Sequence, residues 1–394
     1  MQGVVFLGDR KLELRDFPDP TPGPRDVILE IKASGMCGSD LHNYRAPAQP
    51  GGTVAGGIKR QAGVIAGHEP SGVVAAVGTG VTEGEARVGQ RVMDHHYEGC
   101  GVCKHCRAGW TQMCLAGTVV YGSGVSEKEA RIGDRVMDHH YTGCGTCKHC
   151  RSGWAQMCLD GATVFGANGN GAHAKYMKVP VATLVPLPDA LSFETGAAIS
   201  CGTGTAWGAL RRVQLQGGET IAIFGQGPVG LSATQLAVVM GARVIAIDVA
   251  PERRALAREF GAHEVIDPAA GDVVKAIRDL THGEGAHKTL DASSAPDARA
   301  AAVRAVRSWG TACFVGERGQ VTLDVSPDLL RRQVTLVGSW TFSKQGQAEC
   351  AEFVADRGVD VEKLFTHRWR LGQAREAYEL FDTQTTGKAV ILPS

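Results

Sequence analysis

The sequence has no excess of either charge and no long apolar run. Acidic and basic residues number 41 each, and the isoelectric point is near 7.2. Because nucleic-acid-binding domains normally carry a basic face, this balance predicts that nucleic acid is not a partner. No stretch reaches the roughly 18 uninterrupted apolar residues that indicate a membrane-spanning helix. We therefore expect no membrane span and no membrane partner.

No export signal is visible either. The first residues, MQGVVFLGDRKLELRDF, contain no apolar segment typical of a secretory leader. The sequence has 12 cysteines, but dense disulfide frameworks belong to short exported chains, and this chain has 394 residues. We therefore expect a cytoplasmic protein whose clustered thiols bind metal.

Two nearly identical segments hold eight of the 12 cysteines. Residues 80–115 recur at 124–159, 44 residues later, with 28 of 36 positions identical. Each copy contains C-x2-C-x2-C-x7-C, and four such thiols can form the tetrahedral sulfur shell of a structural zinc site. The predicted ligands are Cys100, Cys103, Cys106 and Cys114 in the first copy, and Cys144, Cys147, Cys150 and Cys158 in the second. Solenoids and propellers need more than two repeats, so we interpret the pair as a local tandem duplication.

The pattern of elements changes near residue 203. Residues 1–202 read as short strands separated by Gly/Pro turns, as in DVILEIKASG and AHAKYMKVP, which is typical of a small β-barrel. Residues 203–340 alternate apolar strands with helices, which predicts a doubly wound parallel sheet covered on both faces. Residues 341–394 add a helical segment and a final strand, KAVILPS. The predicted fold class is therefore α/β with an additional β-barrel domain.

A glycine-rich turn near the start of the second pattern predicts a dinucleotide site. Gly225-Gln226-Gly227-Pro228-Val229-Gly230 is G-x-G-x-x-G between an expected strand and an expected helix. Its glycines allow close approach of a pyrophosphate to the helix N-terminus. Asp248 ends the next strand, where an acidic side chain binds the ribose hydroxyls and repels a 2′-phosphate. Asp248 could instead cap the helix that begins at Pro251. Arg253 and Arg254 lie close by and could weaken the preference for NAD over NADP, but we predict NAD.

Three further metal-binding residues stand far apart in the sequence. They are Cys37 in GMCGSDLH, His68 in AGHE and Cys201 in SCGTG. Two cysteines and one histidine leave one coordination position of zinc open, as catalytic zinc sites do. Taken alone, each cysteine could be ordinary buried packing and His68 a turn residue. Together with the dinucleotide motif, the set predicts a catalytic zinc.

These motifs and their order resemble those of zinc-dependent medium-chain dehydrogenases/reductases of the alcohol, polyol and threonine dehydrogenase type. The resemblance covers the whole chain apart from the extra repeat. It implies a GroES-like catalytic domain at 1–202, a Rossmann NAD-binding domain at 203–340 and a C-terminal segment, 341–394, that returns to the catalytic domain. It also implies a homodimer or homotetramer.

The resemblance further implies the chemistry of the site. Zinc would act as a Lewis acid on the oxygen of a small alcohol, and hydride would pass from the substrate carbon to the nicotinamide of NAD. Ser39 would accept the alcohol proton, and a relay through the cofactor ribose would end at His42. Asp40 and Glu69 are expected to orient His68 and tune the metal. The expected substrate is a secondary alcohol, a diol or a polyol.

Several alternatives remain open at the level of sequence. Many polyol dehydrogenases of the family carry Glu where Cys201 stands, whereas His96 or His140 occupies the place of a pocket aromatic in simple alcohol dehydrogenases and favours a polar substrate. Threonine-type or formaldehyde-type oxidation is a rival activity. A zinc-free quinone or enoyl reductase is disfavoured by the three ligands, and a catalytically impaired zinc-lobe interaction protein is the non-enzyme alternative. The barrel has one place for the strand RVMDHH, at 91–96 or 135–140, and we hypothesise that the second copy fills it.

Overall fold

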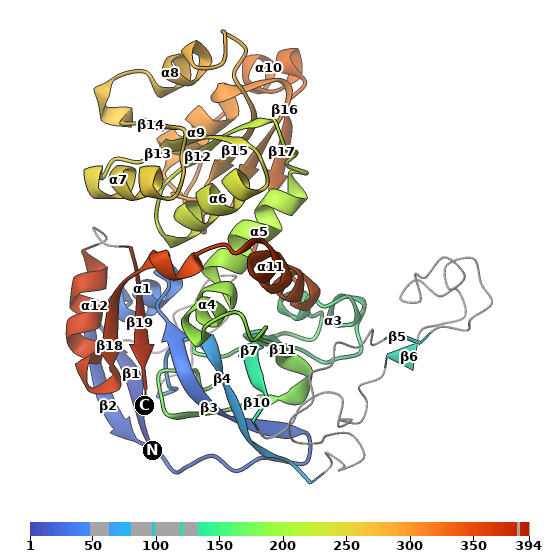
Figure 1. Ribbon diagram of the computed structural model, residues 1–394, viewed down its shortest axis with the longest axis vertical. Coiled ribbons are helices and arrows are strands. Elements are labelled where there is room, and N and C mark those ends of the chain that lie inside the picture. Colours follow the sequence, from blue (N-terminus) through green and yellow to red (C-terminus); the bar gives the residue numbers. More distant parts are fainter. Residues whose placement is uncertain (48–62, 80–96, 99–118, 121–132, 384–386, 394) are drawn as a thin grey trace.

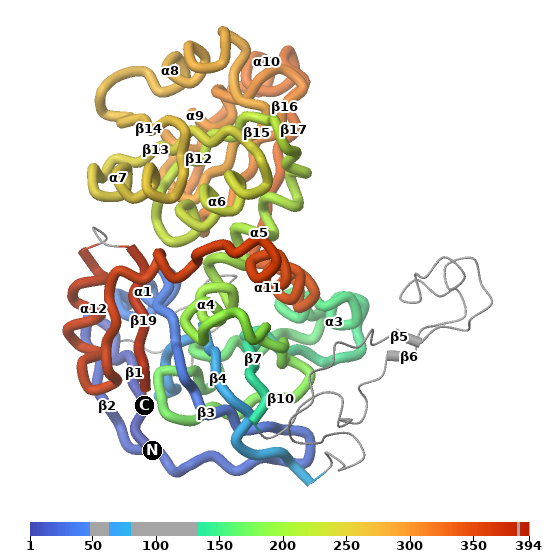
Figure 2. The backbone as a smooth tube through the Cα atoms, in the orientation of Figure 1, coloured from blue at the N-terminus to red at the C-terminus, as the bar shows by residue number. Residues whose placement is uncertain are grey.

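The computed structural model describes residues 1–47, 63–79, 97–98, 119–120, 133–383 and 387–393. Within these residues, a β-rich part and a part built on a parallel sheet lie end to end along the long axis of the molecule (Figure 1). The backbone passes from the β-rich part to the parallel sheet and then returns, so that both chain ends lie in the β-rich part (Figure 2). Among the described helices, none is both long and apolar enough to cross a membrane.

A seven-stranded sheet organises the β-rich part. Six strands follow the order β11-β7-β4-β3-β19-β18. The seventh, β10, also pairs with β3 but does not belong to this linear order. The strands are β3 (Asp26–Gly35), β4 (Glu69–Val77), β7 (Arg135–Asp138), β10 (Tyr176–Pro180), β11 (Leu184–Pro186), β18 (Phe365–Arg370) and β19 (Lys388–Leu392). Since β19 runs antiparallel to β3, the end of the chain completes a sheet that its beginning starts.

Smaller elements surround this sheet. Three two-stranded ladders are β1 (Gln2–Gly8) with β2 (Lys11–Asp16), β5 (Tyr97–Glu98) with β6 (Val119–Val120), and β8 (Tyr141–Thr142) with β9 (Thr163–Val164). The helices are α1 (Gly38–Arg45), α3 (Lys148–Arg151), α4 (Phe193–Ile199), α11 (Lys344–Arg357) and α12 (Ala374–Asp382). Helix α5 (Gly202–Arg212) leads from here into the parallel sheet.

The second part is a six-stranded parallel sheet. Its order is β14-β13-β12-β15-β16-β17. The strands are β12 (Thr220–Phe224), β13 (Arg243–Ile247), β14 (Glu264–Ile266), β15 (Ala286–Asp291), β16 (Val306–Phe314) and β17 (Thr335–Gly338). The connecting helices are α6 (Pro228–Val239), α7 (Pro251–Glu259), α8 (Val273–Asp279), α9 (Pro296–Ala305) and α10 (Val325–Asp328). The predicted α/β class with a doubly wound sheet is confirmed.

Strand order fixes where a ligand binds to this sheet. The strands that follow β12 in the sequence lie first on one side of it, as β13 and β14, and then on the other, as β15 to β17. Ligands bind at such a switch point, beyond the carboxyl ends of the strands. Strand β12 is buried along its whole length, because helices cover both faces, which explains its apolar sequence TIAIF. It ends directly before Gly225, so the glycine-rich turn lies at the switch point.

One hydrophobic core joins the two parts. It contains Ala33 and Met137 from the seven-stranded sheet, Leu210 from α5, Ile223 from β12 and Leu236 from α6. A second core under β3 holds Val27, Leu29 and Ile31, which alternate along the strand and therefore point to one face. The continuous core holds the β-rich part against the parallel sheet, where the two together can form a site.

The second copy of the repeat supplies the strand that lies in the sheet. Strand β7 pairs with β4 on one side and with β11 on the other. The matching strand of the first copy, 91–96, lies outside the described residues. The ladder between β5 and β6 pairs Tyr97 with Val120, and the ladder between β8 and β9 pairs Tyr141 with Val164, which are the same positions 44 residues later. Both copies thus show the same backbone ladder.

Replacement of Met137 tests which copy fills the sheet. Its side chain is fully buried in the joining core. Met137→Ala should lower the free energy of unfolding by about 2–5 kcal/mol, because it removes buried methylene groups and leaves a cavity. The matched control is Met93→Ala, the same change in the first copy. Urea unfolding that shows an equal or larger loss for Met93→Ala would contradict the placement of the second copy in the sheet.

Candidate active site

The three proposed catalytic zinc ligands lie together although they are far apart in the sequence. Candidate ligand atoms of Cys37, His68, Glu69 and Cys201 lie within 4.8 Å of one another. Sγ of Cys37 is 3.6 Å from Sγ of Cys201, which is 3.4 Å from Nε2 of His68. Cys37 stands directly before α1, His68 directly before β4 and Cys201 directly before α5, so three element ends converge.

A buried carboxylate orients His68. Nδ1 of His68 lies 3.0 Å from Oδ1 of Asp40, and Oδ2 of Asp40 accepts a 2.9 Å hydrogen bond from the backbone N–H of Cys37. A carboxylate only accepts, so Nδ1 carries a proton, and in the neutral imidazole that binds a metal the lone pair lies on Nε2, beside the thiols. Metal-bound histidines have the same arrangement. The donor set and its orientation therefore fit zinc with one open position.

Glu69 belongs to this cluster but is held by a lysine. Both side chains are almost completely buried, and Nζ of Lys388 lies 2.5 Å from Oε2 of Glu69 and donates a 3.0 Å bond to the carbonyl of Met36. Burial raises the pKa of Glu69 to about 7, although Lys388 favours the ionised form. Sequence reasoning missed Lys388. Its signal is a single lysine at the head of the apolar strand KAVIL.

Ser39 and His42 both lie on α1. The hydroxyl of Ser39 is 3.1 Å from Nε2 of His68, which places it at the ligand cluster. His42 follows one turn later and is half-buried, and burial lowers its pKa, with Arg318 and Arg45 adding to the effect. Within the described residues no hydrogen bond joins Ser39 to His42, so a relay between them needs a group in between.

One wall of the site comes from the second copy of the repeat. The ring of His140 lies 5.0 Å from that of His68 and 4.3 Å from that of Tyr141, whose ring lies 6.1 Å from that of Trp340. Burial lowers the pKa of His140 well below its usual value, and the neighbouring imidazoles add to this. Its counterpart in the first copy, His96, lies outside the described residues.

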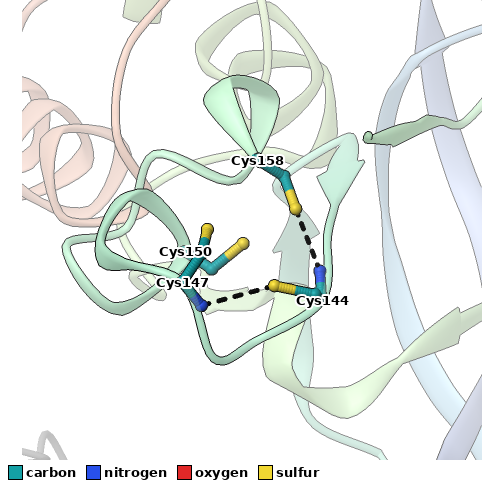
Figure 3. A group of neighbouring side chains, drawn as sticks. All are labelled: Cys144, Cys147, Cys150 and Cys158. Atoms are coloured by element: carbon teal, nitrogen blue, oxygen red, sulfur yellow. Dashed lines mark hydrogen bonds between the residues drawn. The ribbon is translucent and has the colours of Figure 1, made fainter. Parts of the chain in front are cut away.

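The cysteine lobe of the second copy brings its four thiols together. Figure 3 shows the side chains of Cys144, Cys147, Cys150 and Cys158 around one centre, and their sulfurs lie within 4.8 Å of one another. Backbone N–H groups of Cys144 and Cys147 donate 3.3 Å bonds to Sγ of Cys158 and Cys144. Backbone hydrogen bonds lower the pKa of Cys147 to about 6 and so favour the thiolate. Four converging thiols fit a structural zinc. Cys100, Cys103, Cys106 and Cys114 lie outside the described residues.

The glycine-rich turn brings the backbone close to the N-terminus of helix α6. Gly225 has a φ of +87°, which favours glycine, and lies against Ser293. A Cβ on Gly230 would come within 1.8 Å of the carbonyl of Gly225, so only glycine permits this approach of helix α6 to the turn. Pro228 and Val229 are the first residues of α6, whose N-terminus faces the turn.

Asp248 holds two backbone segments of this site. Its Oδ2 accepts a 2.6 Å bond from the N–H of Gln226 in the turn, and its Oδ1 accepts a 2.8 Å bond from the N–H of Ala250. The N-cap of α7 is Ala250, so Asp248 stabilises the approach to the helix rather than capping it. Each carboxylate oxygen retains acceptor capacity, which leaves room for ribose hydroxyls.

The two arginines after Asp248 differ in their surroundings. Arg254 bonds the carbonyls of Asp248 and Val249 and pairs with Asp267 at 2.9 Å. Nη1 of Arg253 instead lies 4.0 Å from where a Cβ of Gly227 would stand, and its Nε is buried with no hydrogen-bond partner among the described residues. A half-buried cationic group at a glycine-rich turn fits the anionic part of a dinucleotide.

Comparison with known proteins identifies relatives over the whole chain. Residues 228–356 match the family model of a zinc-binding dehydrogenase, and residues 23–128 and 115–189 match that of an alcohol dehydrogenase GroES-like domain. An uncharacterized zinc-type alcohol dehydrogenase-like protein of Escherichia coli, YphC, is 34% identical over 99% of this chain and 98% of its own. The sorbitol dehydrogenase of Bacillus subtilis is 27% identical over 96% and 93%.

Solved structures show the same architecture. The alcohol dehydrogenase TADH from Thermus sp. ATN1 superposes with a TM-score of 0.79 at 26% identity, over 100% of this chain and 99% of that one. An NAD-dependent alcohol dehydrogenase superposes with a TM-score of 0.75 at 25% identity, over 100% of both chains.

Removal of the Asp40 charge tests how His68 is oriented. Asp40→Asn should weaken zinc binding at the catalytic cluster, or lower kcat, by about 10–100-fold, because the partner that fixes the imidazole tautomer is lost. Chelator competition followed by metal analysis measures the first quantity, and steady-state kinetics the second. Asp279→Asn, in an exposed ion pair with Lys275, is the control. Unchanged zinc affinity and unchanged kcat would exclude the orienting role of Asp40.

Proposed function

Because the chain belongs to the zinc-dependent medium-chain dehydrogenases/reductases, we propose that Cys37, His68 and Cys201 hold the catalytic zinc of an enzyme that transfers hydride between an alcohol and NAD. The protein is a zinc-dependent oxidoreductase of alcohols or polyols. One observation supports the assignment of the site: two thiols and an imidazole converge. Asp40 bonds Nδ1 of His68, so Nε2 is the nitrogen that is available to a metal. We divide the chain into a catalytic domain at 1–202, a Rossmann domain at 203–340 and a returning segment at 341–394.

The side chains have separate tasks in this reaction. When bound, zinc supplies Lewis-acid polarisation and NAD supplies the hydride acceptor. Oγ of Ser39, which lies 3.1 Å from Nε2 of His68, accepts the alcohol proton and passes its own hydroxyl proton into the relay. His42 receives that proton at the far end of the relay, and its lowered pKa leaves it neutral and able to accept it near pH 7.

The surrounding charges support this centre. Asp40 keeps His68 in the metal-binding tautomer. Lys388 neutralises Glu69, so the carboxylate stays beside the cluster without adding a free negative charge. Asp248 and Arg253 are proposed to contact the ribose and the pyrophosphate of NAD, next to Gly225, Gly227, Pro228, Val229 and Gly230.

We also propose a homodimer or homotetramer in the cytoplasm. Strand β17 is the last strand of the parallel sheet, and an open strand edge can pair with that of a second copy. Apolar side chains at or near this edge are exposed, among them Leu336 and Leu330. Clustered thiols that bind zinc and the use of NAD fit a reducing compartment.

NADH formation with the zinc-loaded protein tests the proposed function. The substrate panel contains secondary alcohols, diols, polyols, threonine and formaldehyde, each with NAD and with NADP. We expect oxidation of at least one alcohol or polyol, faster with NAD, loss of the activity on chelation and its return with zinc. Turnover confined to threonine or formaldehyde would favour the alternative dehydrogenases. No turnover at full zinc loading would favour an impaired zinc-lobe interaction protein.

Zinc content tests the two cysteine lobes. We expect about three zinc ions per chain, since one catalytic cluster and two four-thiol lobes are proposed and the backbone ladders of both copies have the same register. Cys147→Ser in the second copy and Cys103→Ser in the first should each remove about one zinc by metal analysis. About two zinc ions in the unchanged protein, with no further loss in Cys103→Ser, would show that the first lobe is empty.

A further inference from the structure

We infer that His140 selects substrates that carry a second hydroxyl group on the carbon next to the one that is oxidised. This inference rests on the proposed function, since it requires that the cluster of Cys37, His68 and Cys201 hold the reacting oxygen. It narrows the substrate class from alcohols in general to vicinal diols and polyols.

His140 borders the cluster without belonging to it. Its ring centroid lies 5.0 Å from that of His68, and only 2% of the residue is exposed. Among the described residues, the group whose ligand atoms lie within 4.8 Å of one another does not include His140. The ring therefore stands where it can contact a molecule held at the cluster, rather than the metal itself.

A hydrogen bond fixes which nitrogen of His140 donates. Nδ1 lies 2.9 Å from the carbonyl oxygen of Ser200, and a carbonyl can only accept, so Nδ1 carries the proton. Ser200 is itself fixed, because its hydroxyl lies 3.0 Å from the carbonyl oxygen of Pro70 and 2.9 Å from that of Gly196 and can donate to either. In the neutral imidazole of a buried site, Nε2 is then an acceptor with a fixed direction.

The acceptor Nε2 of His140 is open. It has no hydrogen-bond partner within the described residues, and it is not sealed from solvent. Nε2 of His139, by contrast, is both unpartnered within these residues and sealed from solvent. His139, the next residue on the same segment, instead directs Nδ1 toward Oε1 of Gln347 at 3.3 Å. Of these two histidines, His140 alone offers a free acceptor to a ligand at the cluster.

This acceptor can distinguish alcohols by their neighbouring groups. Because the ring of His140 borders His68, the group that it reaches is attached close to the reacting carbon. A hydroxyl on the adjacent carbon can donate to Nε2, while an alcohol with hydrogen at that place leaves Nε2 unpaired once the bound molecule displaces water. A site that is built to bond a hydroxyl group rejects the analogue that lacks it more strongly than an apolar pocket rejects an added group.

A matched pair of substrates tests the inference on the unchanged enzyme. Propane-1,2-diol and propan-2-ol have the same carbon chain and differ by one hydroxyl group. With zinc and NAD, kcat/KM should be about tenfold or more higher for the diol, the effect of one buried hydrogen bond. Butane-1,3-diol, whose second hydroxyl lies one carbon further away, should behave like the simple alcohol.

Two variants assign the preference to Nε2. His140→Asn retains an amide donor for the carbonyl of Ser200 but has no group at the place of Nε2, and His140→Phe has neither. In both, the ratio of kcat/KM between propane-1,2-diol and propan-2-ol should fall to near one. His139→Asn is the matched control and should keep the ratio. The ratio is measured at equal zinc content. A variant that only lowers the amount of active enzyme changes both kcat/KM values equally and leaves their ratio unchanged.

The outcomes separate the two proposals. A ratio near one in the unchanged enzyme, or a ratio that His140→Asn preserves, would overturn the role of His140 while leaving the alcohol dehydrogenase function intact. Absence of turnover with every alcohol at full zinc loading would overturn the proposed function and this inference with it. If the His140 variants fail to fold, a ratio near one in the unchanged enzyme still overturns the inference.

Discussion

The hydrogen bond between Asp40 and His68 is the contact on which the rest of the site depends. It places the proton on Nδ1 and turns the lone pair of Nε2 toward the sulfurs of Cys37 and Cys201. Asp40 can do this only because its other oxygen is fixed by the backbone of Cys37 and because it is fully buried. One carboxylate therefore joins two of the three proposed ligands and fixes the orientation of both.

The fold explains why such a site needs most of the chain. Its ligands stand before α1, β4 and α5, and the lysine that pairs with Glu69 arrives with the last strand, β19, beside β3. A common hydrophobic core then sets the cluster against the parallel sheet, whose switch point carries the glycine-rich turn. The proposed metal cluster and the glycine-rich turn thus lie on two parts that share one core.

The sequence alone predicts which residues form the site, but it does not predict which side chains surround them. Spacing and residue type were enough to select Cys37, His68, Cys201 and the glycine-rich turn, because these groups have few other uses in such combinations. The pair of Lys388 with Glu69 could not be predicted, since it joins residues more than 300 positions apart through strand pairing alone. The hypothesis that the second copy fills the sheet agrees with the pairing of β7, although the repeat itself does not distinguish His96 from His140, because both copies read RVMDHHY.

Anomalous diffraction from crystals, recorded on both sides of the zinc absorption edge, tests the central claim most directly, because it locates zinc independently of activity. We expect one peak bound by Sγ of Cys37, Nε2 of His68 and Sγ of Cys201, at about 2.0–2.3 Å from each. A second peak should lie among Cys144, Cys147, Cys150 and Cys158. A zinc-replete crystal with a peak in the cysteine lobe but none at the cluster of Cys37, His68 and Cys201 would contradict the assignment of the catalytic centre.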